Sequence, residues 1–185
     1  MVVLTAVQAL IDYGGFRLFA SSKLPISREN STLKYGAIDR TIVHNSDPCL
    51  AQKMQRISAI LCLSKHKVAS PLDSNNYVEL HMPRDIEGHL GTDNRYYVID
   101  TARLFPPEAP KYATVDGKRR WCSPLPEDYK YYRPCIVEHL VFQLRPELLR
   151  RFVLPLSSDA FSKYVVRGVD GEEAEGALLC LTLSS

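Results

Sequence analysis

The most regular hydrophobic pattern in the chain lies between Asp47 and Leu63, where apolar residues recur every three or four positions. This spacing gathers them on one face of a helix. Asp47 and Pro48 are residue types typical of a helix N-cap and first turn. The sequence therefore predicts a helix from Asp47 to Leu63 that buries one apolar face, formed by Leu50, Met54, Ile57, Ile60 and Leu61.

Alternation of polar and apolar residues elsewhere predicts short strands. Asp93 and Asn94 are turn residues, and the segment from Leu90 to Asp100 is expected to be a hairpin around them. The predicted strands are Gly15–Ala20, Thr32–Ala37, Arg40–His44, Tyr77–His81 and Tyr96–Ile99.

Helices are also expected near both ends of the chain. Val2–Asp12 has apolar residues at roughly helical spacing and stops at Gly14 and Gly15, which fit a C-terminal cap. Pro146 fits the first turn of another helix, and Ser157–Asp159 would cap a further one. Together the pattern predicts one α+β domain, with small antiparallel sheets packed with helices.

The segment from Pro106 to Pro134 differs from the rest because it contains six prolines and five tyrosines or tryptophans. Proline lacks a backbone donor and is excluded from helix interiors, so a long irregular loop is expected at 106–134. Residues 168–185 change to an acidic and then apolar composition. The predicted organisation is therefore a domain at 1–167 followed by a C-terminal segment at 168–185.

The composition narrows the class of protein without naming an activity. The 185 residues are 45% hydrophobic and 24% charged, with a formal net charge of +2, as in an ordinary globular protein. No apolar run approaches the roughly 20 residues of a membrane-spanning helix, so none is expected. The five cysteines are scattered without C-x-x-C pairs, which indicates reduced thiols, a cytoplasmic location, and neither disulfides nor a zinc site.

The segment 85–108 holds the densest group of residues that can carry chemistry. A hairpin would bring its ends together, so His89, Asp93 and Asp100 are candidates for a divalent cation site or for acid–base catalysis. The structural alternative is that Asp93 makes the turn and Asp100 pairs with Arg95 or Arg103. The pattern alone favours this structural alternative.

Residues 88–108 also resemble the signature block of the Clu domain of the clustered mitochondria protein family. The resemblance begins at Gly88-His89-Leu90-Gly91-Thr92-Asp93 and continues from Tyr96 to Glu108. Further matching segments, from Gly15-Phe16-Arg17-Leu18 to Pro155–Phe161, extend it over about residues 13 to 164. The signature positions are Gly88, His89, Gly91, Asp93, Asp100, Arg103, Pro106 and Pro107.

The resemblance implies a cytosolic protein concerned with the intracellular distribution of mitochondria. It also implies binding to messenger RNA or a ribonucleoprotein and a link to translation initiation. Family members usually carry tetratricopeptide-type repeats, which this sequence lacks. The resemblance supplies no catalytic residues and implies no cofactor.

A basic and aromatic cluster gives separate evidence for an RNA partner. Cations that neutralise phosphates alternate with rings on which bases can stack. The alternative is a loop whose cations are solvated and whose rings pack beneath it. The candidate RNA-binding residues are Lys118, Arg119, Arg120, Trp121, Tyr131, Tyr132 and Arg133.

Two other functions remain open at this point. An atypical kinase-like phosphotransferase, or a degenerate relative of one, would use His89, Asp93 and Asp100 and would need Mg²⁺. A scaffold that docks other protein modules would instead expose an apolar patch. We expect a non-enzymatic interaction module, with messenger RNA or a ribonucleoprotein as its favoured partner.

Overall fold

The computed structural model describes residues 2–27, 32–38, 42–70, 73–108, 112–115, 118–121, 142–160 and 162, with only the backbone described at 70, 73–76, 112–115 and 118–121. The described helices are α1 (Pro48–Ile60) and α2 (Pro146–Leu149). The described strands are β1 (Val3–Leu4), β2 (Gln8–Tyr13), β3 (Phe16–Ser21), β4 (Leu33–Gly36), β5 (His44–Asn45), β6 (His66–Ser70), β7 (Asp73–Leu80), β8 (Glu87–Leu90), β9 (Tyr96–Ile99), β10 (Tyr112–Val115) and β11 (Lys118–Trp121).

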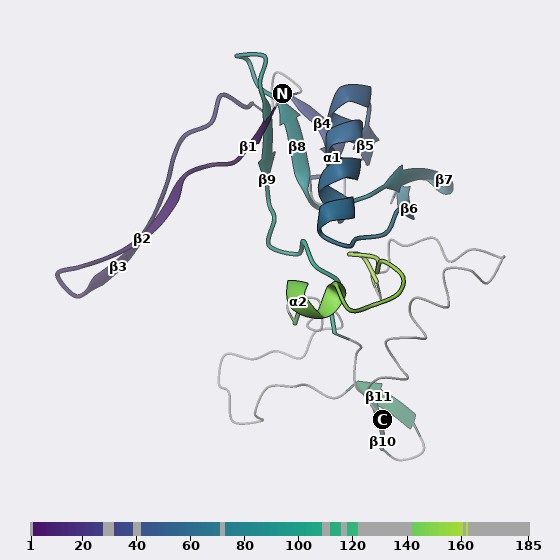
Figure 1. Cartoon of the computed structure of the whole chain (residues 1–185). Coiled ribbons are helices and arrows are strands. Elements are labelled where there is room, and N and C mark those ends of the chain that lie inside the picture. Colours follow the sequence, from purple (N-terminus) through teal and green to yellow (C-terminus); the bar gives the residue numbers. More distant parts are fainter. Residues whose placement is uncertain are drawn as a thin grey trace.

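A five-stranded sheet in the order β1-β9-β8-β4-β5 forms the centre of the fold, and α1 lies across one face of it (Figure 1). Its pairs are antiparallel except β1–β9, which is parallel. The β8–β9 hairpin pairs Gly88 with Val98 and His89 with Tyr97. The 88–108 block therefore begins in the middle of the main sheet.

Helix α1 confirms the helix predicted from its apolar spacing, although it ends at Ile60. The predicted buried face wrongly included Ile60, which is 71% exposed. Asp47 is the N-cap, and its side chain accepts a hydrogen bond from the Leu50 N–H at 2.9 Å. Leu50 and Met54 are fully buried against the sheet. The core around them includes Tyr35, Leu80, Met82 and Ile86.

Residues 142–160 return to this core. Leu149 and Leu156 belong to the core, and Leu156 forms a parallel bridge with Leu63, just after α1. Pro107 forms an antiparallel bridge with Gln143. Residues 142–160 therefore belong to the same folded unit as the sheet.

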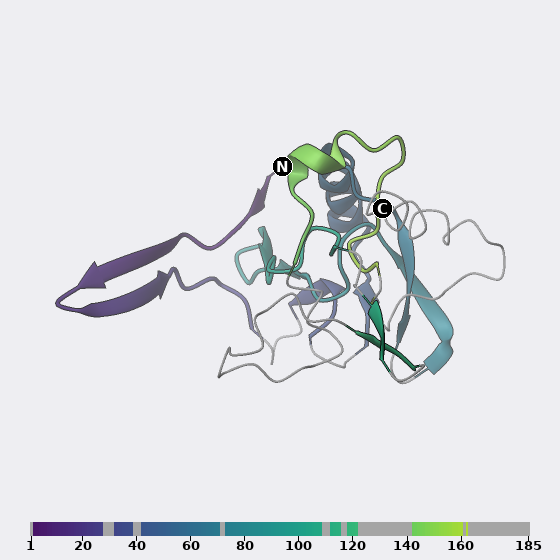
Figure 2. The ribbon, with the colours of Figure 1, turned by 90° about the horizontal axis from the view of Figure 1, so that it is seen from below.

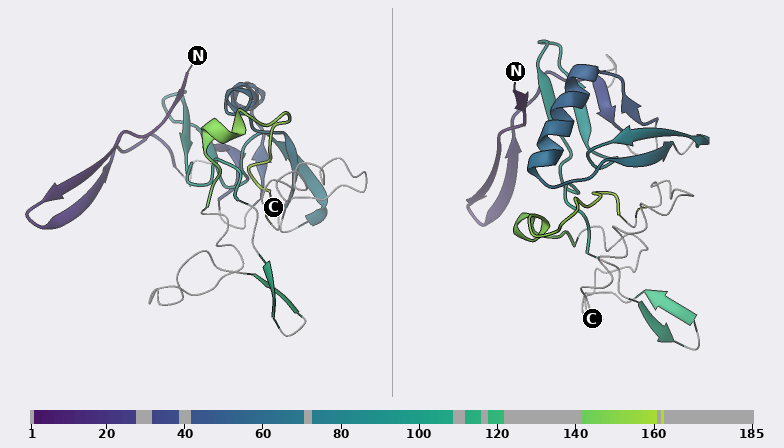
Figure 3. Two further views of the ribbon diagram at one scale, coloured as in Figure 1. Left: turned by 60° about the horizontal axis from the view of Figure 1, so that its bottom comes forward. Right: turned by 45° about the vertical axis from the view of Figure 1, so that its right-hand side comes forward.

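Three two-stranded hairpins accompany the main sheet. In the β6–β7 hairpin, the carbonyl of Glu79 on β7 accepts a hydrogen bond from the Asn45 side chain at the sheet edge. The β2–β3 hairpin projects away from the body as an arm, which Figures 2 and 3 show from three directions. The third hairpin is β10–β11.

The N-terminal helix prediction is wrong, because Val2–Asp12 contributes strands β1 and β2. Gly14 and Gly15 both have positive φ, at 57° and 81°, and connect β2 to β3 instead of capping a helix. Two glycines that can take this conformation make the tightest hairpin connection. The apolar residues of this segment therefore lie on two strands, and successive side chains of β2 point to opposite faces of the β2–β3 hairpin.

Three other local predictions differ from the structure. The strand predicted at Arg40–His44 is confirmed only at its last residue, since β5 is His44–Asn45, Ile42 and Val43 are not in a strand, and 40–41 lie outside the described residues. The segment predicted as irregular at 106–134 contains strands β10 and β11, while 109–111, 116–117 and 122–134 lie outside the described residues. The predicted cap at Ser157–Asp159 is followed by a turn through residue 160, and the part of that predicted helix after residue 162 is not described. Helix α2 is confirmed at Pro146 but has four residues.

The predicted fold class is confirmed, since small, mainly antiparallel sheets pack with helices in one α+β unit. The described helices are few and short, so the strands supply most of the framework. In the described ranges, no helix is both long and apolar enough to cross a membrane.

Candidate functional site

The β8–β9 hairpin carries His89, the most buried of the predicted candidates. His89 is 3% exposed; its Nδ1 lies 3.0 Å from Thr32 Oγ1 and its Nε2 lies 3.2 Å from Glu87 Oε2. Burial lowers the pKa of His89, and the hydrogen bond to Glu87 only partly opposes this shift. In the neutral form, Nε2 donates to Glu87 and Nδ1 accepts from the Thr32 hydroxyl.

Thr32, His89 and Glu87 thus form a hydroxyl–imidazole–carboxylate chain, an order also found around catalytic nucleophiles. Thr32 is 5% exposed, and its hydroxyl oxygen also accepts from the Ser27 N–H at 3.1 Å. The Ser27 carbonyl, 2.9 Å away, is a second acceptor for the single hydroxyl proton and competes for it with His89 Nδ1. A nucleophile must be reachable by its substrate, and this hydroxyl is covered. The chain of contacts instead joins β8 to the loop that leads into β4.

Asp93 lies in the turn between β8 and β9. It accepts a hydrogen bond from the Tyr97 hydroxyl at 2.7 Å and another from the Arg95 N–H at 3.2 Å. The bond from Tyr97 holds the pKa of Asp93 below its usual value and raises the pKa of Tyr97. Gly91 fits beneath them, because a Cβ at Gly91 would lie 2.7 Å from the Asp93 carboxylate.

Asp100 lies at the opposite end of β9, with a φ of 53° and its side chain exposed. The four residues of β9 separate it from the Asp93 turn by about 13 Å of extended chain. The predicted pairing of Asp100 with Arg95 or Arg103 is wrong, because Arg95 pairs with Asp93, and the Arg103 Nε lies 2.6 Å from the Asp85 carboxylate. Burial raises the pKa of Asp85, which Arg103 partly offsets.

The hairpin therefore separates the three predicted candidates, with His89 between the two ends, buried and bonded to other partners. No group of three or more His, Cys, Asp or Glu side chains in the described ranges could hold a metal ion. The Mg²⁺ site that a phosphotransferase would build from His89, Asp93 and Asp100 gains no support from this arrangement.

The signature residues Gly88, Pro106 and Pro107 are packing residues in the structure. A Cβ at Gly88 would lie 2.9 Å from the Tyr35 Cβ and 3.1 Å from Leu50, so the absent side chain lets α1 approach the sheet. Pro106 and Pro107 are fully buried. The Pro106 carbonyl accepts from the Leu144 N–H at 2.8 Å, which fixes the returning segment.

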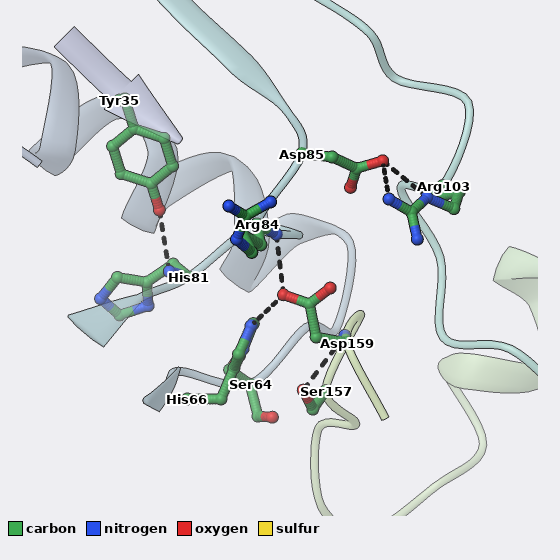
Figure 4. A network of polar contacts seen from close by, with 9 residues as sticks. All are labelled: Tyr35, Ser64, His66, His81, Arg84, Asp85, Arg103, Ser157 and Asp159. Carbon is green, nitrogen blue, oxygen red and sulfur yellow. Dashed lines mark hydrogen bonds and ion pairs between the residues drawn. The ribbon is translucent and has the colours of Figure 1, made fainter. Parts of the chain in front are cut away.

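A buried polar network centred on Asp159 was not predicted from the sequence (Figure 4). Asp159 Oδ2 lies 2.8 Å from His66 Nε2 and accepts from the Arg84 N–H at 2.7 Å. The His66 Nδ1 lies 3.2 Å from the Ser64 carbonyl, and the Asp159 N–H donates to Ser157 Oγ at 3.3 Å.

The partners of His66 are both hydrogen-bond acceptors. The Ser64 carbonyl and the Asp159 carboxylate only accept, so a doubly protonated ring would donate to both. His66 and Asp159, with side chains 2% and 5% exposed, contact each other inside the fold. They lie 93 residues apart in sequence, and no local pattern could have indicated the pair.

The candidate RNA-binding residues fall in two groups. Lys118, Arg119, Arg120 and Trp121 form strand β11, which pairs with β10 from Val115↔Lys118 to Tyr112↔Trp121. Tyr131, Tyr132 and Arg133 lie outside the described residues. The basic cluster is therefore continuous along one strand of a hairpin.

Comparison with known proteins gives the family. A family model described as Clustered mitochondria matches residues 2–110. A Clustered mitochondria protein homolog of Danio rerio is 33% identical over 149 residues, covering 78% of this chain and 10% of the relative. The human homolog is 32% identical over 150 residues, covering 78% of this chain and 11% of the relative.

A third relative, Protein clueless of Drosophila willistoni, is 30% identical over 147 residues, covering 78% of this chain and 10% of the relative. No solved structure matches the chain. The chain spans about a tenth of the length of the curated relatives that it matches. The family model and these relatives agree with the signature in 88–108, and the chain belongs to the clustered mitochondria family.

Proposed function

We propose that this chain is a non-enzymatic interaction module that contributes to the intracellular distribution of mitochondria from the cytoplasm. Family membership carries this proposal, since the relatives are named Clustered mitochondria protein homologs. The buried Thr32 hydroxyl supports a binding role over a hydrolytic one, because a substrate could not reach it.

The partner in this proposal is messenger RNA or a ribonucleoprotein. Lys118, Arg119 and Arg120 provide three adjacent positive charges on β11, and Trp121 follows them. Cations attract the phosphate backbone, and rings stack on the bases of single strands, so the two together suit single-stranded RNA. Other protein modules are the alternative partners.

The test is binding of the complete chain to fluorescently labelled single-stranded RNA, measured by anisotropy at several salt concentrations. Replacing Lys118, Arg119 and Arg120 by alanine is expected to weaken binding by about tenfold or more at low salt. The same substitutions should flatten the dependence of affinity on salt, because fewer counterions are released.

The matched control replaces Lys23, Arg56 and Lys65, three exposed cations outside β11. It removes the same charge, so it separates a local RNA site from overall attraction. Equal losses in both variants would assign the binding to net charge alone. Absence of RNA binding by the folded chain at low salt would contradict the RNA partner and leave protein partners.

A further inference from the structure

The β2–β3 hairpin, which we call the arm, exposes large apolar side chains over its whole length. Tyr13 is 78% exposed and Phe16 is 73% exposed. The arm joins the body at its base, where Val7 and Ser22 hydrogen-bond to each other. Beyond that point it extends into solvent in every view (Figures 1, 2 and 3).

The two faces of the arm differ in chemistry. Paired residues of an antiparallel hairpin point to the same face, and successive pairs alternate between faces. One face has Gln8 and Ser21, then Leu10 and Phe19, then the ion pair of Asp12 with Arg17 at 2.7 Å. The other face, which we call the apolar arm face, consists of Ala9, Ile11, Tyr13, Phe16, Leu18 and Ala20.

The apolar arm face is a surface without a covering layer in the described part of the chain. A two-stranded hairpin is marginally stable in water and normally needs a third strand or a packed layer. Contiguous exposed apolar patches mark interaction sites. Packing against a partner would therefore stabilise the arm, and the apolar arm face is a surface on which a partner could bind.

We propose that the apolar arm face docks against the same face of a second copy of this chain. Nothing on this face is charged, so two copies can meet without burying an ion. The one polar group is the Tyr13 hydroxyl beside the tip, where it can stay at the wet edge of the interface. The Asp12–Arg17 pair remains on the outer face, in water.

The shape of the molecule permits this arrangement. Because the arm projects from the body, two arms can pack antiparallel about a two-fold axis with the bodies at opposite ends (Figures 2 and 3). Two sheet faces pack with their backbones about 10 Å apart, with side chains interdigitating between them. The result is a small four-stranded sandwich whose apolar side chains are inside.

The size of the face indicates a weak dimer. A fully buried aromatic side chain buries about 150–250 Å² of surface. The six residues of the apolar arm face, two of them aromatic, could bury roughly 400 Å² of surface per copy on dimerisation. The total of about 800 Å² lies below the roughly 1,000 Å² of stable specific interfaces, so the association is expected to be transient, with a dissociation constant that is micromolar or weaker. The arm should therefore exchange between monomer and dimer instead of forming a permanent assembly.

A lipid surface is the competing occupant, and the charge of the arm disfavours it. Helices and loops that bind membranes combine apolar residues with cations that attract anionic lipids. Within the arm, the positive charge of Arg17 is neutralised by Asp12. An apolar protein face matches this surface better than an anionic bilayer does.

The test is sedimentation equilibrium of the complete chain from about 1 to 300 µM, a range that spans a micromolar dissociation constant. The face variant Ile11→Thr/Leu18→Thr alters one cross-strand pair on the apolar arm face. The control variant Leu10→Thr/Phe19→Thr alters the neighbouring pair on the outer face. Threonine keeps a high strand propensity in both variants.

We expect wild type and control to dimerise and the face variant to associate at least about tenfold more weakly, with unchanged far-UV circular dichroism. A monomer throughout the range, or equal weakening in both variants, would overturn the proposal. Co-sedimentation of monomeric wild type with vesicles of phosphatidylcholine and anionic phospholipid would also overturn the proposal, because the apolar arm face would then bind lipid. A loss of circular dichroism in the face variant alone would be resolved by the wild-type concentration series, which tests dimerisation without any substitution.

Discussion

Buried polar residues in this fold take their properties from their immediate partners. His89 and His66 are both buried, yet their partners differ. His89 faces a hydroxyl that can donate to it, which suits a neutral ring, whereas His66 faces two oxygens that can only accept. The same residue type therefore contacts a hydroxyl and a carboxylate at one position and a carbonyl and a carboxylate at the other.

The pH dependence of stability should reveal the buried His89. Its folded-state pKa lies below the ordinary value of 6.5, so the unfolded chain takes up the proton first as pH falls. The stability contributed by neutral His89 is thus complete above about pH 6.5 and is lost below it. Burial also lowers the pKa values of His44 and His81, which act in the same direction.

His89→Gln is therefore expected to reduce the loss of stability between about pH 7.5 and about pH 5.5. The measurement is urea unfolding of both proteins at the two values, compared as the change in unfolding free energy. His44→Gln provides a comparison at a more exposed ring, where a smaller reduction is expected. An unchanged pH dependence in His89→Gln would show that the ring titrates normally.

At the scale of elements, the hydrophobic pattern predicts a helix or strand correctly where it matches only one of the two periods, that of a helix or that of a strand. Where it matches both periods, the prediction can fail. Helix α1 follows a long 3.6-residue period with its own cap, so its position could be predicted. Val3, Val7, Leu10 and Ile11 fit a helix equally well, but the following glycines form a hairpin. Short apolar runs are ambiguous in this way, and tertiary pairing decides them.

The N-cap of α1 links the helix to the main sheet, because Asp47 also accepts from the Tyr96 hydroxyl at 3.0 Å. Asp47→Ala is expected to lower the unfolding free energy by about 1–2 kcal/mol through the lost cap. A further loss of about 1 kcal/mol is expected because the Tyr96 hydroxyl loses its acceptor. Chemical denaturation monitored at 222 nm would measure both effects.

Two further variants separate the contribution of the helix cap from that of the hydrogen bond between Asp47 and Tyr96. Asp47→Asn keeps a good capping side chain and should cost less than Asp47→Ala. Tyr96→Phe removes only the hydroxyl, with an expected cost of about 1 kcal/mol. If Asp47→Ala and Asp47→Asn proved equally destabilising, the carboxylate charge and not the cap would be the stabilising feature.

At the scale of the whole molecule, contacts between distant segments decide which residues form a site. The sequence indicated the 88–108 block as a unit and its hairpin was found, because turn and strand residues are adjacent there. It could not indicate that Asp159 meets His66 and the Arg84 backbone, since each belongs to a different segment. The separation of Asp93 from Asp100 follows from the predicted hairpin itself, because a strand lies between the turn and Asp100. The contact of His89 with Thr32 joins distant segments and could not be predicted from a local pattern.

The Asp159 network predicts that the returning segment 142–160 is held by charge as well as by the apolar packing of Leu156. With His66 protonated, Asp159→Asn leaves a buried cation without its carboxylate partner, so the unfolding free energy should fall by about 3–5 kcal/mol. Glu147→Gln removes an exposed carboxylate from the same segment and should change stability by less than about 0.5 kcal/mol.

Urea denaturation would give both values, and the double variant His66→Gln/Asp159→Asn should be less destabilised than the sum of the two single variants. Additive losses would mean that His66 and Asp159 stabilise the fold independently, which would contradict the proposed coupling between them.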